Sequence, residues 1–117
     1  MTILIIINDP PYGTEKAYNA LRLANQLLRD HSEVTVHLFL MADAVGCGIA
    51  GQRTPEGYYN IERMMRIFAS KGGQINACGT CMDARGVSDD VLMPEVRRSS
   101  MADLAQWTAE ADKVISF

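Results

Sequence analysis

The feature that most constrains the fold is an unbroken apolar run near the start of the chain, ILIII at residues 3–7. A strand with one face in water alternates apolar and polar side chains, whereas this run has no polar position and is rich in β-branched residues. It therefore predicts a strand that is buried on both faces, as in a parallel sheet covered by helices.

Helix and strand signals alternate along the rest of the chain. A turn cluster at residues 8–13 precedes Thr14, which we expect to cap a helix, and Asn60 and Ser100 are expected to cap two more. Further strands are expected at residues 33–41, 74–77, 95–98 and 113–117. This alternation predicts an α/β fold, a single three-layer doubly wound domain over residues 1–117 with a mainly parallel five-stranded sheet.

Composition excludes several classes of function. The chain has 117 residues and a net charge of −3, which argues against binding to a phosphate backbone. No apolar run reaches the roughly 18 residues of a membrane span. The first residues lack a basic n-region, and three cysteines without an export signal favour a reducing compartment. We therefore expect a cytoplasmic protein that binds neither nucleic acid nor membrane.

Three segments follow the carboxyl ends of the first three predicted strands, at residues 8–14, 42–58 and 78–90. Binding sites of doubly wound sheets lie beyond these ends, so the three segments are expected to form one rim. Cys47 lies in the second segment and Cys78 in the third. Cys47 stands between two glycines, and we interpret it as a small residue in a tight bend.

The motif Cys78-Gly79-Thr80-Cys81 is the strongest chemical signal. It fits a redox pair, half of a zinc site, a nucleophile with a resolving partner, or ordinary loop residues. Structural zinc needs four ligands, and no second C-x-x-C or H-x₃₋₅-H pattern exists, so we expect no metal and no cofactor. A thioredoxin-like motif would lie near the first βαβ unit, whereas this one follows the third predicted strand.

The placement of the motif favours function over the ordinary loop interpretation. Residues 78–81 lead from a strand end into a possible helical turn, where the backbone N–H groups of Gly79 and Thr80 favour a thiolate. Arg85 lies about one turn further on and is expected to add a positive field at Cys78. Asp83 opposes that field.

Residues 8–12 read NDPPY, which matches the motif with which amino-methyltransferases hold a target nitrogen. No G-x-G-x-x-G pattern accompanies it, so we interpret the segment as a turn between strand and helix. Asp9 and Tyr12 are therefore candidate binding residues of the rim. His37 alternates with apolar residues on the second predicted strand and is interpreted as a hydrogen-bonded histidine, not as a base.

Five stretches together resemble the YchN-like branch of the DsrE/DsrF-like family. They are NDPPYGTE at 8–15, FLMADAV at 39–45, GQR…GYYNI within 51–61, CGTCMDARG at 78–86 and LAQW…ADKV within 104–114. The resemblance implies a doubly wound domain, assembly as a homohexamer, and kinship with cytoplasmic sulfur-relay proteins. Relay proteins of this family use a cysteine just after the third strand, which corresponds to Cys78.

Three hypotheses follow from the residues and the resemblance together. The first is a persulfide acceptor and carrier at Cys78 that works with sulfur donor and acceptor proteins, a sulfurtransferase-like role. The second is a non-catalytic oligomeric module for ligand binding or assembly. The third is a thiol–disulfide oxidoreductase that uses Cys78 and Cys81. The relay proteins need one such cysteine, whereas this chain adds Cys81. A neighbouring thiol can attack a persulfide on Cys78 and release sulfide.

Overall fold

The computed structural model describes residues 1–117, and its centre is a five-stranded sheet in the order β4-β3-β2-β1-β5. Along the chain, the elements are β1 (Thr2–Ile7), α1 (Lys16–Asp30), β2 (Thr35–Leu40), the 3₁₀ helix η1 (Ala42–Gly48), α2 (Ile61–Ser70), β3 (Gln74–Cys78), α3 (Gly79–Ala84), the 3₁₀ turn η2 (Asp89–Val91), β4 (Val96–Ser99), α4 (Met101–Glu110) and β5 (Lys113–Ser116). Every pair of neighbouring strands is parallel. The predicted α/β class and doubly wound sheet are confirmed.

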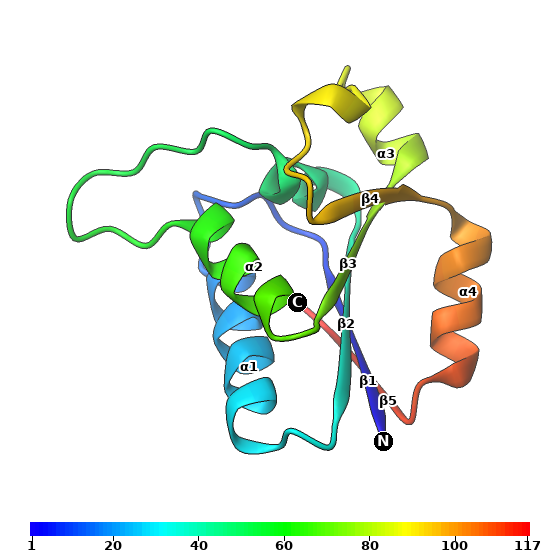
Figure 1. Ribbon diagram of the computed structural model, residues 1–117. Helices are drawn as coiled ribbons and strands as arrows, with labels where there is room; N and C mark the ends of the chain where they lie inside the picture. The colour runs from blue at the N-terminus through cyan, green and yellow to red at the C-terminus, as the bar shows by residue number, and fades with distance from the viewer.

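The strand order explains the layers. The chain steps from β1 to β4 in one direction, then crosses to the other edge for β5. Right-handed crossovers change face when the direction of stepping reverses. Accordingly, α1 and α2 cover one face of the sheet, while α4 covers the other (Figure 1).

The apolar run that opened the chain lies in the middle of this arrangement. Leu4 and Ile5 are fully buried, although adjacent side chains of a strand point to opposite faces. Ile5 lies in register with Leu38 of β2. On the opposite face Trp107 of α4 packs edge-on against Phe39, with ring centroids 6.3 Å apart. Burial on both faces of the sheet explains why this run contains no polar side chain.

Two of the three predicted caps are confirmed. Asn60 Oδ1 accepts the N–H of Arg63 at 2.9 Å, and Ser100 Oγ accepts the N–H of Asp103 at 3.2 Å. The predicted Thr14 cap is wrong, because α1 begins at Lys16 without a side-chain cap. Thr14 Oγ1 accepts the N–H of Lys16 one residue too early to serve as the N-cap.

The interpretation of His37 as a hydrogen-bonded histidine is also wrong. Its ring stacks on the Trp107 indole with centroids 4.2 Å apart, and its Nδ1 is buried without a hydrogen-bond partner. Burial lowers the pKa of His37, and the charge of Glu110 partly opposes this. The stack therefore favours the neutral imidazole.

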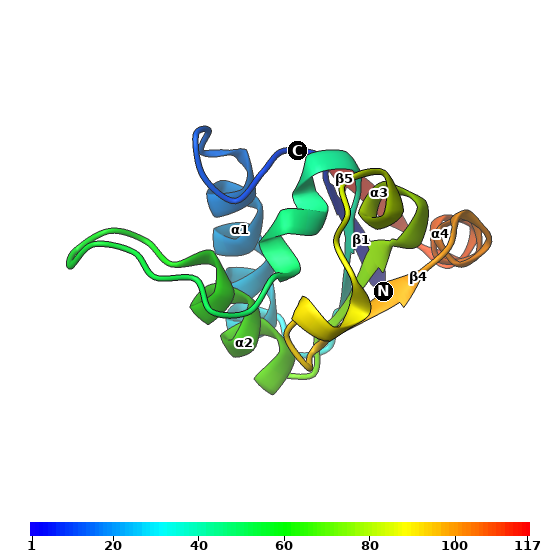
Figure 2. The same cartoon turned by 90° about the horizontal axis from the view of Figure 1, so that it is seen from above.

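The carboxyl ends of the strands meet η1 and α3. Figure 2, which looks down on this end, shows η1 and α3 close to each other above the sheet, while the loop before α2 projects outward. None of the helices combines the length and the apolar character that crossing a bilayer requires.

Candidate functional site

Cys78 is the last residue of β3 and the N-cap of α3. Its side chain is 5% exposed, and its Sγ accepts the N–H of Cys81 at 3.4 Å. The turn after it requires glycine, because a Cβ on Gly79 would lie 2.9 Å from Arg98 Nε and 3.0 Å from the Ser99 carbonyl oxygen. The sequence thus places a thiol at a strand end, where a backbone N–H points to it.

Cys81 occupies the first turn of α3 and is partly exposed. Its Sγ accepts the N–H of Ala42, the first residue of η1, at 3.2 Å. Both sulfur atoms of the motif therefore accept backbone N–H groups, one from α3 itself and one from the element that follows β2. No disulfide joins them, and all three cysteines of the chain are free.

The two thiols influence each other electrostatically. The pKa of Cys78 is raised, first by burial and then by its interaction with the Cys81 side chain. The backbone N–H groups of Cys81 and Thr80 act in the opposite direction, without outweighing these effects. The net result is that Cys78 keeps its proton more strongly than an isolated cysteine.

Arg85 is close to the motif and acts as a clamp. Its Nε donates to Asp43 Oδ1 at 2.8 Å and its Nη1 to the Cys81 carbonyl oxygen at 3.0 Å. The guanidinium therefore joins η1 to α3, and Asp43 neutralises its charge. The positive field that the sequence suggested at Cys78 is paired with a carboxylate.

A second arginine, Arg98 of β4, holds the other side of α3. Its Nη2 donates to Asp83 Oδ2 at 2.7 Å and its Nη1 to Asp89 Oδ1 at 3.4 Å. The side chain packs directly on the backbone of Gly79. The only sequence signal for this role was the expected strand at residues 95–98, whose last residue contacts the turn after β3.

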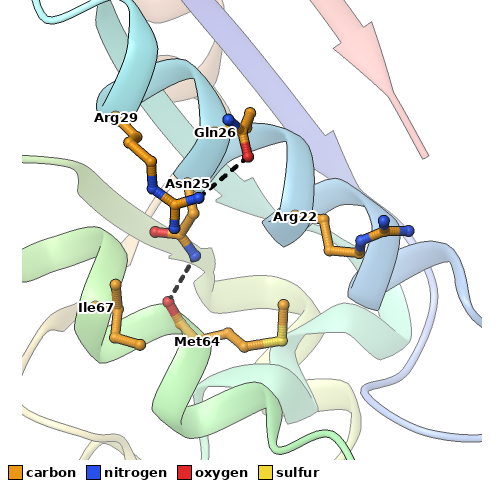
Figure 3. A pocket seen from close by; sticks show the side chains of 6 residues that line it. All are labelled: Arg22, Asn25, Gln26, Arg29, Met64 and Ile67. Carbon is orange, nitrogen blue, oxygen red and sulfur yellow. Dashed lines mark hydrogen bonds between the residues drawn. The ribbon is translucent and has the colours of Figure 1, made fainter.

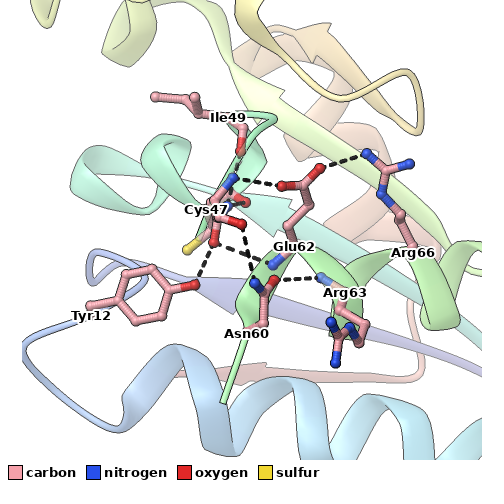
Figure 4. A network of polar contacts seen from close by, with 8 residues as sticks. Tyr12, Cys47, Ile49, Asn60, Glu62, Arg63 and Arg66 are labelled. Carbon is pink, nitrogen blue, oxygen red and sulfur yellow. Dashed lines mark hydrogen bonds and ion pairs between the residues drawn. The ribbon is translucent and has the colours of Figure 1, made fainter. Parts of the chain in front are cut away.

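Tyr12 belongs to a separate polar network (Figure 4), and Asp9 joins it through Cys47. The Tyr12 hydroxyl donates to Gln52 Oε1 at 2.6 Å and accepts the N–H of Ile61 at 3.1 Å. The Asp9 carbonyl oxygen accepts the thiol of Cys47 at 3.8 Å. No hydrogen bond or ion pair links this network to Cys78 or Cys81.

Gln52 is the centre of that network, and the sequence did not reveal it. Its side-chain Nε2 donates to the carbonyl oxygens of Cys47 and Ile49, both at 2.9 Å. Its backbone N–H donates to Glu62 Oε1 at 2.8 Å. Glu62 in turn pairs with Arg66, so the start of the projecting loop is fastened to α2.

The DsrE/DsrF-like family model matches residues 1–117, the whole of the chain. The chain belongs to the DsrE/DsrF-like family. This finding confirms the resemblance that the motifs suggested.

Within the DsrE/DsrF-like family, the chain is similar to Protein YchN of Escherichia coli strain K12, with 44% identity over 115 residues, 98% of this chain and 97% of that protein. The crystal structure of ychN protein from E. coli matches it with a TM-score of 0.95 at 43% identity, covering 100% of this chain and 99% of the other. Sulfurtransferase TusD of Salmonella paratyphi B is a more distant relative, 23% identical over 128 residues with full coverage of both chains.

In this chain, neither Cys78 nor Cys81 lines a cavity. The largest hollow, about 290 Å³, lies between α1 and α2. Arg22 and Arg29 line it from separate turns of α1 (Figure 3). It is lined by Arg22, Asn25, Gln26, Arg29, Met64 and Ile67. No three His, Cys, Asp or Glu side chains converge in a metal-binding arrangement. The groups at the pair itself are the two thiols and the backbone N–H groups that donate to them.

Proposed function

We propose that this protein takes up sulfane sulfur as a persulfide on Cys78 and carries it within a cytoplasmic sulfur relay. Membership of the DsrE/DsrF-like family and the distant similarity to a sulfurtransferase support a role in sulfur transfer. The carrier step is a thiol exchange: the Cys78 thiolate attacks the outer sulfur of a donor persulfide, and the donor thiolate leaves.

The observation that carries the proposal is the position of Cys78 at the end of β3, with the Cys81 N–H directed at its sulfur. A hydrogen bond to this sulfur stabilises the negative charge that it bears as an attacking thiolate. The Cys78 sulfur, which would be the inner atom of the persulfide, is nearly completely buried, and this limits its access to thiols in solution.

The test measures sulfur uptake directly. Wild type, Cys78→Ser and Cys47→Ala are mixed with inorganic polysulfide without oxygen, and iodoacetamide stops the reaction at early times. Intact mass and peptide mapping then locate the added sulfur. We expect one added sulfur on Cys78 in wild type and in Cys47→Ala, and none in Cys78→Ser.

Cys47→Ala is the matched control because Cys47 is a fully buried cysteine outside the motif. Uptake by Cys78→Ser at the wild-type rate would refute the proposal. Absence of uptake in every protein would refute it too, and would favour a non-catalytic module.

We further propose that the chain works as a homo-oligomer, with a hexamer as the expected state. Large apolar side chains remain exposed on separate parts of the surface: Tyr58 by 50%, Met101 by 59% and Val114 by 44%. Burial of such side chains between subunits is a usual source of interface stability. Light scattering at micromolar concentration tests this, and a monomer mass would refute it.

A further inference from the structure

Ala42 has a backbone conformation that is unusual for its residue type. Its φ is +51°, and it is the only non-glycine residue of the chain with a positive φ. An alanine in this left-handed region is strained, because its Cβ approaches its own backbone. The surrounding structure must therefore hold Ala42 in place, and such strained residues concentrate at functional sites.

The conformation directs the N–H of Ala42 at a sulfur atom. Ala42 begins η1, and the residue before it provides no side-chain cap for the free N–H groups at this end. The Cys81 sulfur accepts this N–H at 3.2 Å. The Arg85 clamp between Asp43 and the Cys81 carbonyl oxygen fixes the same two segments relative to each other.

The two sulfur atoms consequently have different surroundings. Cys78 is buried, and a persulfide on it would stand beside Cys81, whose own N–H donates to the Cys78 sulfur. Cys81 is more exposed, and the N–H that it accepts comes from outside α3. This hydrogen bond favours negative charge on the Cys81 sulfur and holds it in one position.

We propose that the protein also discharges the sulfur that it carries, with Cys81 as the nucleophile and Ala42 as its positioning residue. In this step, which rests on the proposed carrier function, the Cys81 thiolate attacks the inner sulfur of the Cys78 persulfide. A disulfide forms between Cys78 and Cys81, the sulfur–sulfur bond of the persulfide breaks, and hydrosulfide leaves with the electron pair. A dithiol reductant then restores both thiols.

The first arm of the test separates discharge from carriage. Wild type and Cys81→Ser are loaded with inorganic polysulfide, freed from excess reagent, and followed by sulfide release and intact mass. We expect wild type to release one sulfide and to lose two thiols as the disulfide forms. We expect Cys81→Ser to take up sulfur on Cys78 and to keep it.

Each other result has a definite meaning. If wild type loads sulfur but holds it as long as Cys81→Ser does, the discharge step is wrong while the carrier function stands. If neither protein takes up sulfur, the carrier function fails and discharge fails with it.

The second arm tests Ala42 without changing a side chain. An α-hydroxy acid counterpart of alanine at position 42 replaces the amide by an ester and removes the N–H. We expect discharge to slow by about tenfold, the typical effect of losing a hydrogen bond to a charged group, while uptake on Cys78 is unchanged. The same replacement at Ala105, an exposed residue of α4, controls for the ester itself. Equal discharge rates in the two esters would overturn the role of Ala42, and so would an equal loss of uptake and discharge.

Discussion

Cys47 and the Cys78/Cys81 pair follow neighbouring strands of one sheet, yet their hydrogen bonds run in opposite directions. The thiol of Cys47 donates to a carbonyl oxygen, whereas the sulfur atoms of Cys78 and Cys81 accept backbone N–H groups. A donated bond holds the proton on sulfur, and an accepted bond stabilises negative charge. The direction of the hydrogen bond thus distinguishes the packed cysteine from the two for which we propose sulfur chemistry.

The interactions that hold the two regions in place differ as well. Gln52 and Glu62 close the Cys47 region with partly buried hydrogen bonds. The pair is held from outside by Arg85 and Arg98, which form ion pairs near the surface. We therefore expect the first region to contribute more to the free energy of unfolding than the second.

The largest expected effect concerns thiol reactivity. Burial raises the pKa of Cys47 to about 12, so its thiol stays protonated at neutral pH. We expect limiting iodoacetamide to label Cys81 or Cys78 and to leave Cys47 unlabelled until denaturant is added. Peptide mapping decides this, and early labelling of Cys47 would contradict the contrast between the two regions.

The next effect concerns the network around Cys47. Gln52→Ala removes two donors to carbonyl oxygens and the acceptor for Tyr12, which leaves buried polar groups without partners. We expect the free energy of unfolding to fall by about 2–3 kcal/mol in urea titrations. Gln26→Ala, on the exposed face of α1, is the control and should change it by less than about 0.5 kcal/mol. Equal values for the two variants would show that the network contributes nothing special.

A smaller effect is expected from acid. Burial would raise the pKa of Glu62, but hydrogen bonds from Arg66 and Gln52 and the charge of Arg66 outweigh it, so the pKa is lowered from 4.5. Near and below pH 4.5, Glu62 therefore binds more protons in the unfolded chain than in the folded protein. The stability that its charged form contributes above about pH 4.5 is lost as the pH falls further. Glu62→Gln should flatten this part of the stability curve, which thermal unfolding at several pH values will show. An unchanged slope would mean that another group is responsible.

The smallest effect is expected at the pair itself. Arg85→Ala breaks an ion pair in which the side chain of Asp43 is 64% exposed, and such pairs contribute less than about 1 kcal/mol. We expect the free energy of unfolding, measured in urea, to fall by less than about 1 kcal/mol. A loss of unfolding free energy as large as that of Gln52→Ala would show that the region of Cys78 and Cys81 stabilises the fold as much as the Cys47 network does. The two regions would then not differ in stability.

Much of the fold followed from local sequence patterns. The burial of residues 3–7 and the caps at Asn60 and Ser100 depend on side-chain types within a few positions, so the sequence predicts them. The third cap failed because Thr14 lies one residue too early, and a propensity rule does not resolve such a shift.

The candidate site was predictable only where it is local. Cys78, Cys81 and Arg85 lie within one turn-and-helix segment, and the structure brings them together. Ala42 lies 39 residues from Cys81 in the chain, and Gln52 lies 40 residues from Tyr12. Arg98 lies 15 residues from Asp83. No sequence pattern marks an alanine with a positive φ. Asp9 and Tyr12 share the rim but take part in the Cys47 network, a division that spacing alone does not show.

The stack of Trp107 on His37 gives the molecule an optical reporter of its own. Trp107 is the only tryptophan of the chain, so all indole fluorescence comes from the contact between α4 and the sheet. A protonated imidazole quenches the emission of a stacked indole. The emission should therefore dim only at a pH below the ordinary value of 6.5, because burial lowers the pKa of His37. The intrinsic emission of Trp107 can therefore report the packing of α4 against the sheet, without any added dye, while the thiols of the same protein react.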